Sequence, residues 1–377
     1  MIRDGLKVHF QADPPRYKRA QRDSKDPVEK GLVIQKLKKV RERRYIAEGY
    51  VVSLTSFFPV EKGDDDIRMV YDGSVSGLND AMWVSRFVLP TINTHLRAVE
   101  EQTYMADVDV GEMFLNFILH EDLRSLSGVD LTCFFPSKDG APVWETWQRA
   151  AMGLKSSPYQ CTQAMGVAEE VVRGDRLNAT NVFRWDRVRM NLPGQATYDP
   201  SVPWVSKVRN EDERIAADLF TFVDDLRPTG TGKKQSWQAG RRSASVLGHL
   251  GIQDASRKRR DSSQTPGAWA GAVVRTGSDG VFVLASEEKW LKAKRLLKEV
   301  LELLNADSLH LPRKRLEQIR GFLMYVTRTY VGMAPYMICL WHTCGATDAQ
   351  RYLEDTRSVG WRCGENRGGR SLCPCFR

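Results

Sequence analysis

Two adjacent carboxylates, Asp224 and Asp225, stand between the apolar run 219–223 and the turn-forming sequence 227–230. A strand that delivers two charged groups to a tight turn is poorly suited to building a core. A third carboxylate, Asp109, lies in a second strand-like segment upstream. Carboxylates that converge from two strand ends can hold a pair of Mg²⁺ ions, the arrangement used for in-line displacement at phosphorus. The sequence therefore indicates a metal site at the end of a sheet.

Charge and composition point to a globular protein with a polyanionic partner. The chain has 377 residues, of which 42% are hydrophobic, with 56 Lys and Arg against 47 Asp and Glu. Residues 1–45 contain 14 Lys and Arg against six acids, and residues 257–260 are Arg-Lys-Arg-Arg. A surplus of this kind favours nucleic acid first and an anionic membrane surface second. The alternative is ordinary solubility charge on solvated faces.

Targeting signals and cysteines favour an intracellular protein of the cytoplasm or nucleus. No run approaches 18 apolar residues, so we expect no membrane span, and the polar start of the chain does not resemble a secretory signal. Seven cysteines are an odd number, which fits reduced thiols. Four of them cluster near the end beside His342: Cys344, Cys363, Cys373 and Cys375. A zinc site there is the alternative, although the spacing fits no common template.

Hydrophobic periodicity predicts mixed strands and helices up to about residue 285 and only helices after it. Predicted strands cover 50–59, 67–71, 131–136, 142–149, 268–274 and 281–284. Predicted helices cover 32–44, 96–101, 157–172, 236–251, 286–304 and 312–330. Residues 104–119 should begin as a strand and become helical, and 215–226 should form a strand and turn. This order predicts an α+β body with a separate helical lobe.

Two segments carry polar groups in unusual surroundings. In the segment 105–115, Asp107 and Asp109 project the same way by the two-residue period of a strand, so a solvent-facing strand is the simple alternative to a site. In the segment 151–163, Gly153 permits close backbone approach before a helix that starts near Pro158. Such a helix start can lie beside a phosphate or a base pair, or it can be an ordinary helix start.

Taken together, these segments resemble the sequence of a reverse transcriptase, as found in retroelements and retroviruses. The resemblance covers roughly residues 32–335, with the motifs in the family's order. It rests on Arg68-Met69-Val70-Tyr71-Asp72-Gly73 with Leu78-Asn79, Asp109-Val110-Gly111-Glu112-Met113-Phe114, Gly153-Leu154-Lys155-Ser156-Ser157-Pro158, Phe222-Val223-Asp224-Asp225, Leu250-Gly251-Ile252 with Arg257-Lys258, and Trp269-Ala270-Gly271.

This sequence departs from the family pattern in four places. Met152 stands where the family often has Gln, and the spacing from Pro158 to Asp224 is long. Arg227-Pro228 is an unusual continuation after the paired aspartates, and nothing after residue 340 resembles a ribonuclease H or an integrase. The resemblance therefore leaves open a catalytically decayed retroelement fragment that only binds nucleic acid.

The resemblance implies a right-hand polymerase, an α+β fold with fingers, an antiparallel palm sheet on helices, and a helical thumb. Residues 1–31 would be a basic, loosely ordered lead-in. The parts would then be fingers at 32–100, palm at 101–285, thumb at 286–340 and an irregular Cys-rich tail at 341–377. A fingers hairpin at about 125–150 and an insertion at about 174–213 would interrupt the palm.

The resemblance also implies roles for individual residues. Asp109 and Asp224 would ligate two Mg²⁺ ions about 3.5–4 Å apart, with Mn²⁺ as an alternative. Asp225 would lie beside them, and the Val110 carbonyl would be a further ligand. Phe114 would stack under the sugar, where a 2′-hydroxyl clashes, and so select deoxynucleotides.

Contacts to nucleotide and nucleic acid complete the predicted site. Arg68 and Lys62 would hold the triphosphate, with Gly153 and Lys155 near the nucleotide. Template and primer contacts would come from Ser157, Pro158, Gln160, Trp269 and Gly271. Lys258 would be a general acid toward pyrophosphate. The expected partners are an RNA template, a DNA primer or product and dNTPs. The other alternative is an RNA-directed RNA polymerase, and the oligomeric state stays open.

Overall fold

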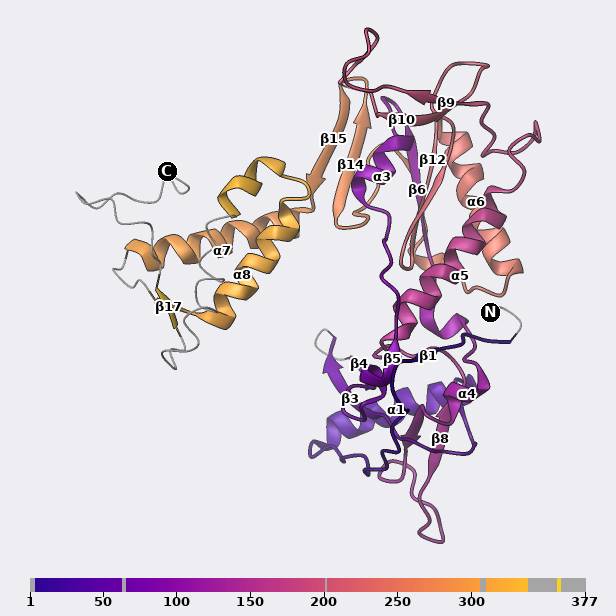
Figure 1. Cartoon of the computed structure of the whole chain (residues 1–377), viewed down its shortest axis with the longest axis vertical. Helices are drawn as coiled ribbons and strands as arrows, with labels where there is room; N and C mark the ends of the chain where they lie inside the picture. The colour runs from indigo at the N-terminus through magenta and orange to yellow at the C-terminus, as the bar shows by residue number, and fades with distance from the viewer. Residues whose placement is uncertain (1–3, 63–65, 201, 306–309, 338–357, 361–377) are drawn as a thin grey trace.

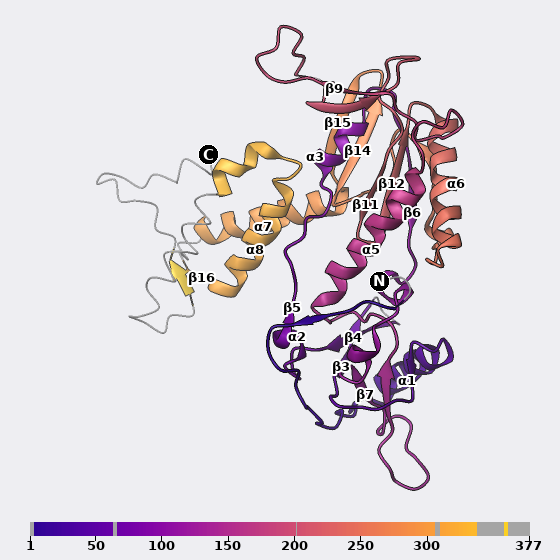
Figure 2. The same cartoon turned by 45° about the vertical axis from the view of Figure 1, so that its right-hand side comes forward.

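The computed structural model describes residues 4–62, 66–200, 202–305, 310–337 and 358–360. Helices and strands alternate in the larger body, and two helices stand to one side of it (Figures 1 and 2). The mixed α and β content predicted from the sequence is confirmed. Among these residues, no helix has the length and apolar character needed to cross a membrane. The Cys and His residues of the zinc alternative lie outside the described residues.

One end of the larger body is organised around helix α1 (Pro27–Glu42), which confirms the predicted helix and starts five residues earlier. Asp26 Oδ1 accepts a hydrogen bond from the Val28 backbone N–H at 3.0 Å. Pro27 occupies the first turn, where its missing N–H costs nothing. Val33 and Leu37, one turn apart, are buried against the core.

Short antiparallel strands pack around this helix. Strands β3 (Ser56–Glu61) and β4 (Ile67–Asp72) form the predicted hairpin in full register. Strands β2 (Ile46–Ala47), β8 (Trp144–Trp147) and β7 (Gly128–Asp130) form a three-stranded sheet. The remaining small elements of this end are β1 (His9–Phe10), α2 (Leu78–Ala81), β5 (Met82–Trp83) and α4 (Glu121–Arg124).

The strand predicted at 131–136 is wrong, because this segment turns back on itself. The carbonyl of Leu131 accepts from the backbone N–H groups of both Phe134 and Phe135 at 2.9 Å. The Asp130 carboxylate bonds the backbone N–H of Thr132 at 3.0 Å, which fixes the start of the turn. Local side-chain chemistry therefore overrides the apolar run that suggested a strand.

The N-terminal segment is packed against the body, in contrast to the loosely ordered lead-in that the sequence suggests. Leu6 and Val8 are buried, and the Leu6 N–H donates to the Ile118 carbonyl at 2.7 Å. Farther on, the Gln21 amide bonds both backbone groups of Phe57, at 2.8 and 3.1 Å. These contacts tie residues 4–21 to elements more than 30 residues away, which local sequence patterns do not report.

The central sheet has the strand order β11-β12-β6-β13. Its strands are β11 (Leu219–Phe222), β12 (Asp225–Gly230), β6 (Tyr104–Asp109) and β13 (Arg260–Ser263). Helices α5 (Ser156–Arg173) and α6 (Lys233–His249) lie side by side on one face (Figure 2). A Cβ at Gly240 of α6 would lie 3.4 Å from Ala106 and 3.9 Å from Val108. Alternation along β6 then turns Asp107 and Asp109 to the opposite face.

A second core covers that opposite face at one end of the sheet. Buried Trp269, Met105 and Phe220 pack there with the short helices α3 (Ile92–His95) and η1 (Leu96–Ala98). The hairpin of β14 (Ala272–Gly277) and β15 (Gly280–Ala285) extends from this core. Large aromatic side chains therefore support the sheet on the face that carries Asp107 and Asp109.

The predicted insertion carries a hairpin of its own, β9 (Arg187–Met190) with β10 (Val205–Val208). A buried acid fastens it to the body. Asp218 accepts from Lys207 Nζ at 2.8 Å and from Arg173 Nε at 2.9 Å. The two cations lower the pKa of Asp218 against the effect of its burial, which raises it.

The separate helical lobe consists of α7 (Glu287–Asn305) and α8 (Arg313–Val326), close to the predicted ranges. Their facing apolar stripes form a small core that includes Leu296 and Ile319. Trp290 and Tyr330 stack with ring centroids 4.8 Å apart. Three further elements are η4 (Val331–Met333) and the paired strands β16 (His310–Pro312) and β17 (Ser358–Gly360).

Candidate active site

Strand pairing brings the three predicted carboxylates to one end of the central sheet. Asp225, the first residue of β12, pairs directly with Asp109, the last residue of β6. Directly opposed residues of antiparallel strands have Cα atoms about 4.5–5.5 Å apart. Asp224 lies in the turn just before, and its carbonyl accepts from the Val110 N–H at 2.8 Å. The three acids, which are far apart or adjacent in the sequence, are therefore close together in space.

The turn that presents Asp224 is strained. Phe222 pairs with Asp225, so only Val223 and Asp224 connect the two strands. Val223 has φ of +59°, a left-handed conformation that is unusual for a β-branched residue. Such a residue costs on the order of 1–3 kcal/mol and persists only where the surroundings hold it. Here the Val110–Asp224 hydrogen bond and the contact of Val223 with the main core supply that restraint.

Negative charge at this end of the sheet is only partly compensated. Burial, followed by the charges of Asp224, Asp109 and Asp107, raises the pKa of Asp225 to about 6. Burial and the charge of Asp109 also raise the pKa of Asp224. Shifts of this direction arise where like charges share a site with limited water. The carboxylates therefore form a site that a cation would stabilise.

Lys258 is the cation that the structure places on this site. Its Nζ lies 3.0 and 3.2 Å from the two carboxylate oxygens of Asp109, and this hydrogen bond raises the pKa of Lys258. Lys258 ends the short helix η3 (Ser256–Lys258), and the preceding Ala255 N–H donates to the Asp109 carbonyl at 2.8 Å. The lysine side chain is 67% exposed, so it is free to leave the carboxylate.

The donor set fits Mg²⁺ in its chemistry. Mg²⁺ prefers hard oxygen ligands, and Asp109 and Asp224 supply them where negative charge is in excess. Within the described part of the chain, however, no three or more His, Cys, Asp or Glu side chains are grouped as a metal site. Both oxygens of Asp109 instead bond the Lys258 ammonium. Loading of a metal would therefore require that this ion pair opens.

A buried ion pair lies directly behind the carboxylates, and the sequence did not predict it as part of the site. Arg227, fully buried, donates to Asp107 Oδ1 at 2.6 Å and to the Gly267 carbonyl at 2.8 Å. Burial lowers the pKa of Arg227 and its neighbour Asp107 opposes this effect. Arg227 lies two residues after Asp225, and Asp107 lies two residues before Asp109, so the pair shares the face of the site. In the sequence, the unusual arginine after the paired aspartates was the signal that could have pointed to this ion pair.

Trp269 supports the same strands from the core, which differs from its predicted contact with template or primer. Its side chain is 1% exposed, so nucleic acid cannot reach the ring. The indole Nε1–H donates to the Asp225 carbonyl at 2.9 Å. Gly271, next but one in sequence, has φ of +89°, and a Cβ there would overlap the Tyr325 hydroxyl of α8. Both residues therefore hold the backbone of the sheet and its link to the helical lobe.

The predicted segment around Gly153 forms a tight junction with the β3–β4 hairpin. Gly153 has φ of +106°, and a Cβ there would overlap the Tyr71 carbonyl. Asn79 clamps the turn by donating to the Gly153 carbonyl at 2.9 Å and accepting from the Lys155 N–H at 2.8 Å. The Lys155 ammonium donates to the Met82 carbonyl at 3.0 Å. This segment therefore positions backbone, as the sequence predicts for Gly153.

The residues after this turn differ in their access to a ligand. Ser157 is buried and donates to the Ala151 carbonyl at 2.9 Å. Helix α5 starts at Ser156, one residue before the predicted start at 157. Gln160 is also buried and donates to the Lys7 carbonyl. Pro158 is exposed. Of these three predicted contacts, only Pro158 presents its side chain to solvent.

Three predicted residues belong to other elements than the carboxylates. Arg68 is exposed on β4, and Lys62, at the other side of the hairpin, pairs with Asp66 at 3.5 Å. Phe114 lies in η2 (Met113–Asn116), half-buried against the main core, where the sequence predicted an α-helical continuation. The hydrogen bonds and the ion pair that the structure shows for the Asp109 carboxylate go to Lys258, and none of these three side chains takes part in them.

Comparisons with known proteins support the fold. No protein-family model matches the chain, and no curated protein matches it. Among solved structures, it is similar to a foamy viral protease-reverse transcriptase dRH in complex with double-stranded DNA, with 15% identity and a TM-score of 0.58. The match covers 94% of this chain and 50% of that chain, so the sequence spans about half of its neighbour's length. The chain therefore has a reverse-transcriptase-like fold.

Proposed function

We propose that the chain is a reverse transcriptase, a DNA polymerase that adds dNTPs to a primer 3′-hydroxyl on an RNA or DNA template. One observation carries this proposal. The register of the central sheet pairs Asp225 with Asp109 and puts Asp224 at the intervening turn. Carboxylates on adjacent strand ends, in a fold similar to that of a reverse transcriptase, suit nucleotidyl transfer.

The parts of the fold would then have the usual polymerase roles. The central sheet with α5 and α6 would be the palm. The β3–β4 hairpin and the small sheet around α1 would be the fingers, and α7 with α8 would be the thumb. The β9–β10 hairpin would be an insertion into the palm. Because a palm sheet is supported by helices on one face, its other face is left for primer and nucleotide.

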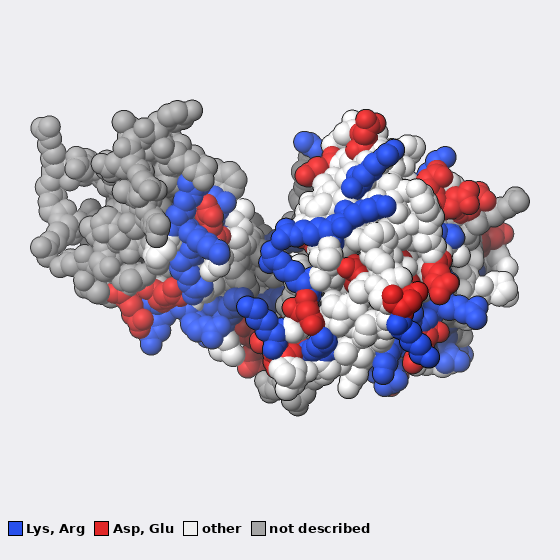
Figure 3. All heavy atoms as spheres, turned by 90° about the horizontal axis from the view of Figure 1, so that it is seen from below, with Lys and Arg blue, Asp and Glu red and all other residues white. Residues whose placement is uncertain are grey.

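Basic side chains stand where a nucleic acid would lie. Figure 3 shows Lys and Arg on both sides of the hollow between the helical lobe and the larger body. On α7 the ammonium of Lys292 lies 4.6 Å from the Phe322 ring centre, which orders a long side chain at the surface. Contacts between basic side chains and phosphates do not read sequence, so nucleic-acid binding should weaken with added salt.

Each candidate residue then has a stated task. Asp109 and Asp224 would hold two Mg²⁺ ions, with the Val110 carbonyl as a further ligand. When bound, such ions lower the pKa of the primer hydroxyl and neutralise triphosphate charge. Arg68 would bind phosphate oxygens by its bidentate fork. Lys258, released from Asp109, would hold a proton at Nζ beside the departing pyrophosphate, and Phe114 would exclude ribonucleotides.

A second candidate function is nucleic-acid binding without polymerisation. The Lys258–Asp109 ion pair favours it, because this ammonium takes the place of a metal at the first carboxylate. In such a protein the carboxylates would have a structural role, and basic surfaces would do the binding.

Primer extension separates the two candidates. The assay uses an RNA template, a labelled DNA primer, dNTPs and Mg²⁺. We expect extension by the wild type and a loss on the order of 10²–10⁴-fold in Asp224→Ala, since a metal ligand contributes several kcal/mol to the transition state. Asp261→Asn, which removes an exposed acid from the adjacent strand β13, is the control and should retain activity. Template binding with no extension by the wild type would establish the second candidate.

A further inference from the structure

Helix α6 has a basic outer face that the proposed polymerase site does not use. The helix contains four Lys and Arg and no Asp or Glu over its 17 residues. Lys233, Lys234, Trp237 and Arg241 are all exposed. The opposite side of the helix packs on Ala106 and Val108 of β6. This basic face therefore lies on the far side of the sheet from Asp107 and Asp109.

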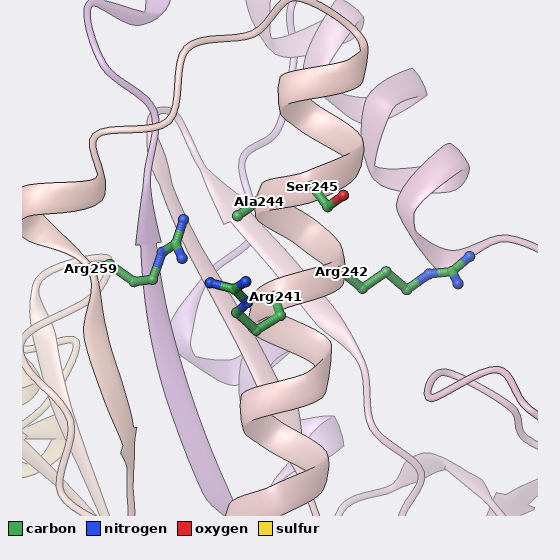
Figure 4. A pocket seen from close by; sticks show the side chains of 5 residues that line it. All are labelled: Arg241, Arg242, Ala244, Ser245 and Arg259. Atoms are coloured by element: carbon green, nitrogen blue, oxygen red, sulfur yellow. The ribbon is translucent and has the colours of Figure 1, made fainter.

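A pocket of about 470 Å³ opens beside this face. It is lined by Arg241, Arg242, Ala244, Ser245 and Arg259. Figure 4 shows Arg241 of α6 and Arg259, which precedes β13, pointing toward one another, while Arg242 points away toward α5. Arg242 is used structurally, because its Nε donates to the Val172 carbonyl at 2.6 Å. The two converging guanidinium groups define the candidate site.

These two arginines are short of acceptors. Within the described part of the chain, no ion pair involves Arg241, and its guanidinium lies 5.6 Å from the Trp237 ring centre. Arg259 pairs with Asp254 through Nη2, and its buried Nε has no hydrogen-bond partner, as is also true of the second carboxylate oxygen of Asp254. An unpaired buried donor costs about 1–3 kcal/mol. An oxyanion between the two guanidinium groups would satisfy that donor and balance the unpaired charge of Arg241.

Trp237 identifies the class of anion. Its side chain is 51% exposed, one turn from Arg241 on the same face of α6. An exposed aromatic ring beside cations provides a stacking surface for an unpaired base, with phosphates bound on either side. From Lys234 to Ser245 the helix rises about 17 Å at 1.5 Å per residue, which is longer than a single phosphate. A free phosphate or nucleotide would leave most of this face without a contact.

We propose that the outer face of α6 and the Arg241–Arg259 pocket bind single-stranded nucleic acid, phosphate in the pocket and a base on Trp237. This binding surface is separate from the carboxylate site and does not depend on catalysis. The two are nonetheless adjacent in the chain, because Lys258 bonds Asp109 and the next residue, Arg259, lines the pocket. A strand held here would lie behind the sheet, outside the proposed primer cleft.

Fluorescence anisotropy with a labelled 12-nucleotide oligo(dT) tests this proposal on the full chain. An excess of unlabelled duplex is added to fill the proposed primer cleft. The double variant Arg241→Gln/Arg259→Gln should bind the oligonucleotide more weakly and lower the slope of log K against log salt by about 0.7, the value for one phosphate that is no longer neutralised. Arg187→Gln/Arg189→Gln on the β9–β10 hairpin removes the same charge elsewhere and should leave the slope unchanged.

Trp237→Ala tests the base contact. Affinity for single strands should fall on the order of tenfold, whereas the matched control Trp204→Ala, 60% exposed on the inserted segment, should have no effect. Duplex binding should be unchanged in both variants, because duplex is expected in the proposed primer cleft and paired bases cannot stack on the Trp237 ring. Unchanged melting temperatures would show that the variants are folded.

An unchanged salt slope in the arginine variant would overturn the proposal, and so would equal effects of Trp237→Ala and Trp204→Ala. The third contrary result is displacement of the oligonucleotide by millimolar inorganic phosphate as readily as by unlabelled oligonucleotide. The last result would mean a small-anion site. Primer extension on a template with an overhang of only a few nucleotides, too short to reach the outer face of α6, should be unchanged in both variants. Absence of primer extension by the wild type would refute the polymerase proposal but would not affect the conclusion about single-strand binding.

Discussion

The buried pair of Arg227 and Asp107 makes an asymmetric prediction about stability. The two side chains differ in their access to water, because Arg227 is fully buried and the Asp107 side chain is 19% exposed. Asp107→Asn would leave a buried guanidinium without its counter-ion, because the amide oxygen at position 107 and the Gly267 carbonyl still accept hydrogen bonds but carry no charge. Arg227→Met would leave a carboxylate that water can still reach. Removal of the acid should therefore be more damaging than removal of the base.

The expected magnitudes follow from the charge left behind. An uncompensated buried charge costs about 3–5 kcal/mol, which we expect for Asp107→Asn. Loss of a charged hydrogen bond with the partner still hydrated costs about 1.5–3 kcal/mol, which we expect for Arg227→Met. The double variant Asp107→Asn/Arg227→Met should be more stable than Asp107→Asn alone, because it contains no stranded charge. The single effects should therefore be strongly non-additive.

Urea unfolding of the four proteins at pH 7, followed by tryptophan fluorescence, measures these free energies of unfolding. The exposed pair Arg275 and Asp279, 2.9 Å apart on the β14–β15 hairpin, is the control. The same cycle there should give a coupling energy of at most about 1 kcal/mol. Equal costs for the two single variants at the buried pair, or additive costs, would refute the reasoning that desolvation of Arg227 decides the outcome.

Three other predictions concern the site and its supports. The pKa of Asp225 is raised to about 6, so the stability that its protonated form contributes is present below pH 4 and is lost as the pH rises to about 6. Asp225→Asn should remove this pH dependence and raise the free energy of unfolding at pH 7 by about 1 kcal/mol, allowing for solvent screening. Urea titrations at several pH values measure both effects. Gly153→Ala should lower the free energy of unfolding by about 2 kcal/mol or more, because of the positive φ and the overlap with the Tyr71 carbonyl. Gly166→Ala, in α5 with open space around it, should raise the free energy of unfolding by about 0.5–1 kcal/mol. Calorimetric melting compares the two variants. Phe114→Ala should relax discrimination against ribonucleotides in primer extension, and unchanged ribonucleotide exclusion would contradict the proposed contact with the sugar.

Local sequence patterns predicted the elements well where one segment decides its own structure. The β3–β4 hairpin, helices α1, α5 and α6, and the β11–β12 turn with its two aspartates all follow from periodicity and turn chemistry. The order of the motifs also indicated the reverse-transcriptase-like fold, which the similarity to a solved structure confirms. The strand expected at 131–136 failed because an Asp side chain turned the backbone locally.

The surroundings of the carboxylates could not be read from the sequence, because they depend on strand register between distant segments. Arg227 and Asp107 are 120 residues apart, and Lys258 and Asp109 are 149 residues apart. A shift of one residue in either pairing would turn these side chains to the other face of the sheet. The position of Trp269 also depends on distant segments. The sequence suggested that it contacts template or primer, whereas packing buries it against the strand that contains Asp225. The sequence by itself determined which acids are present and that each lies at a strand end or in the adjoining turn, since local apolar runs and turns encode this. Only the tertiary structure decided what neutralises and supports them, since those partners meet through register and packing.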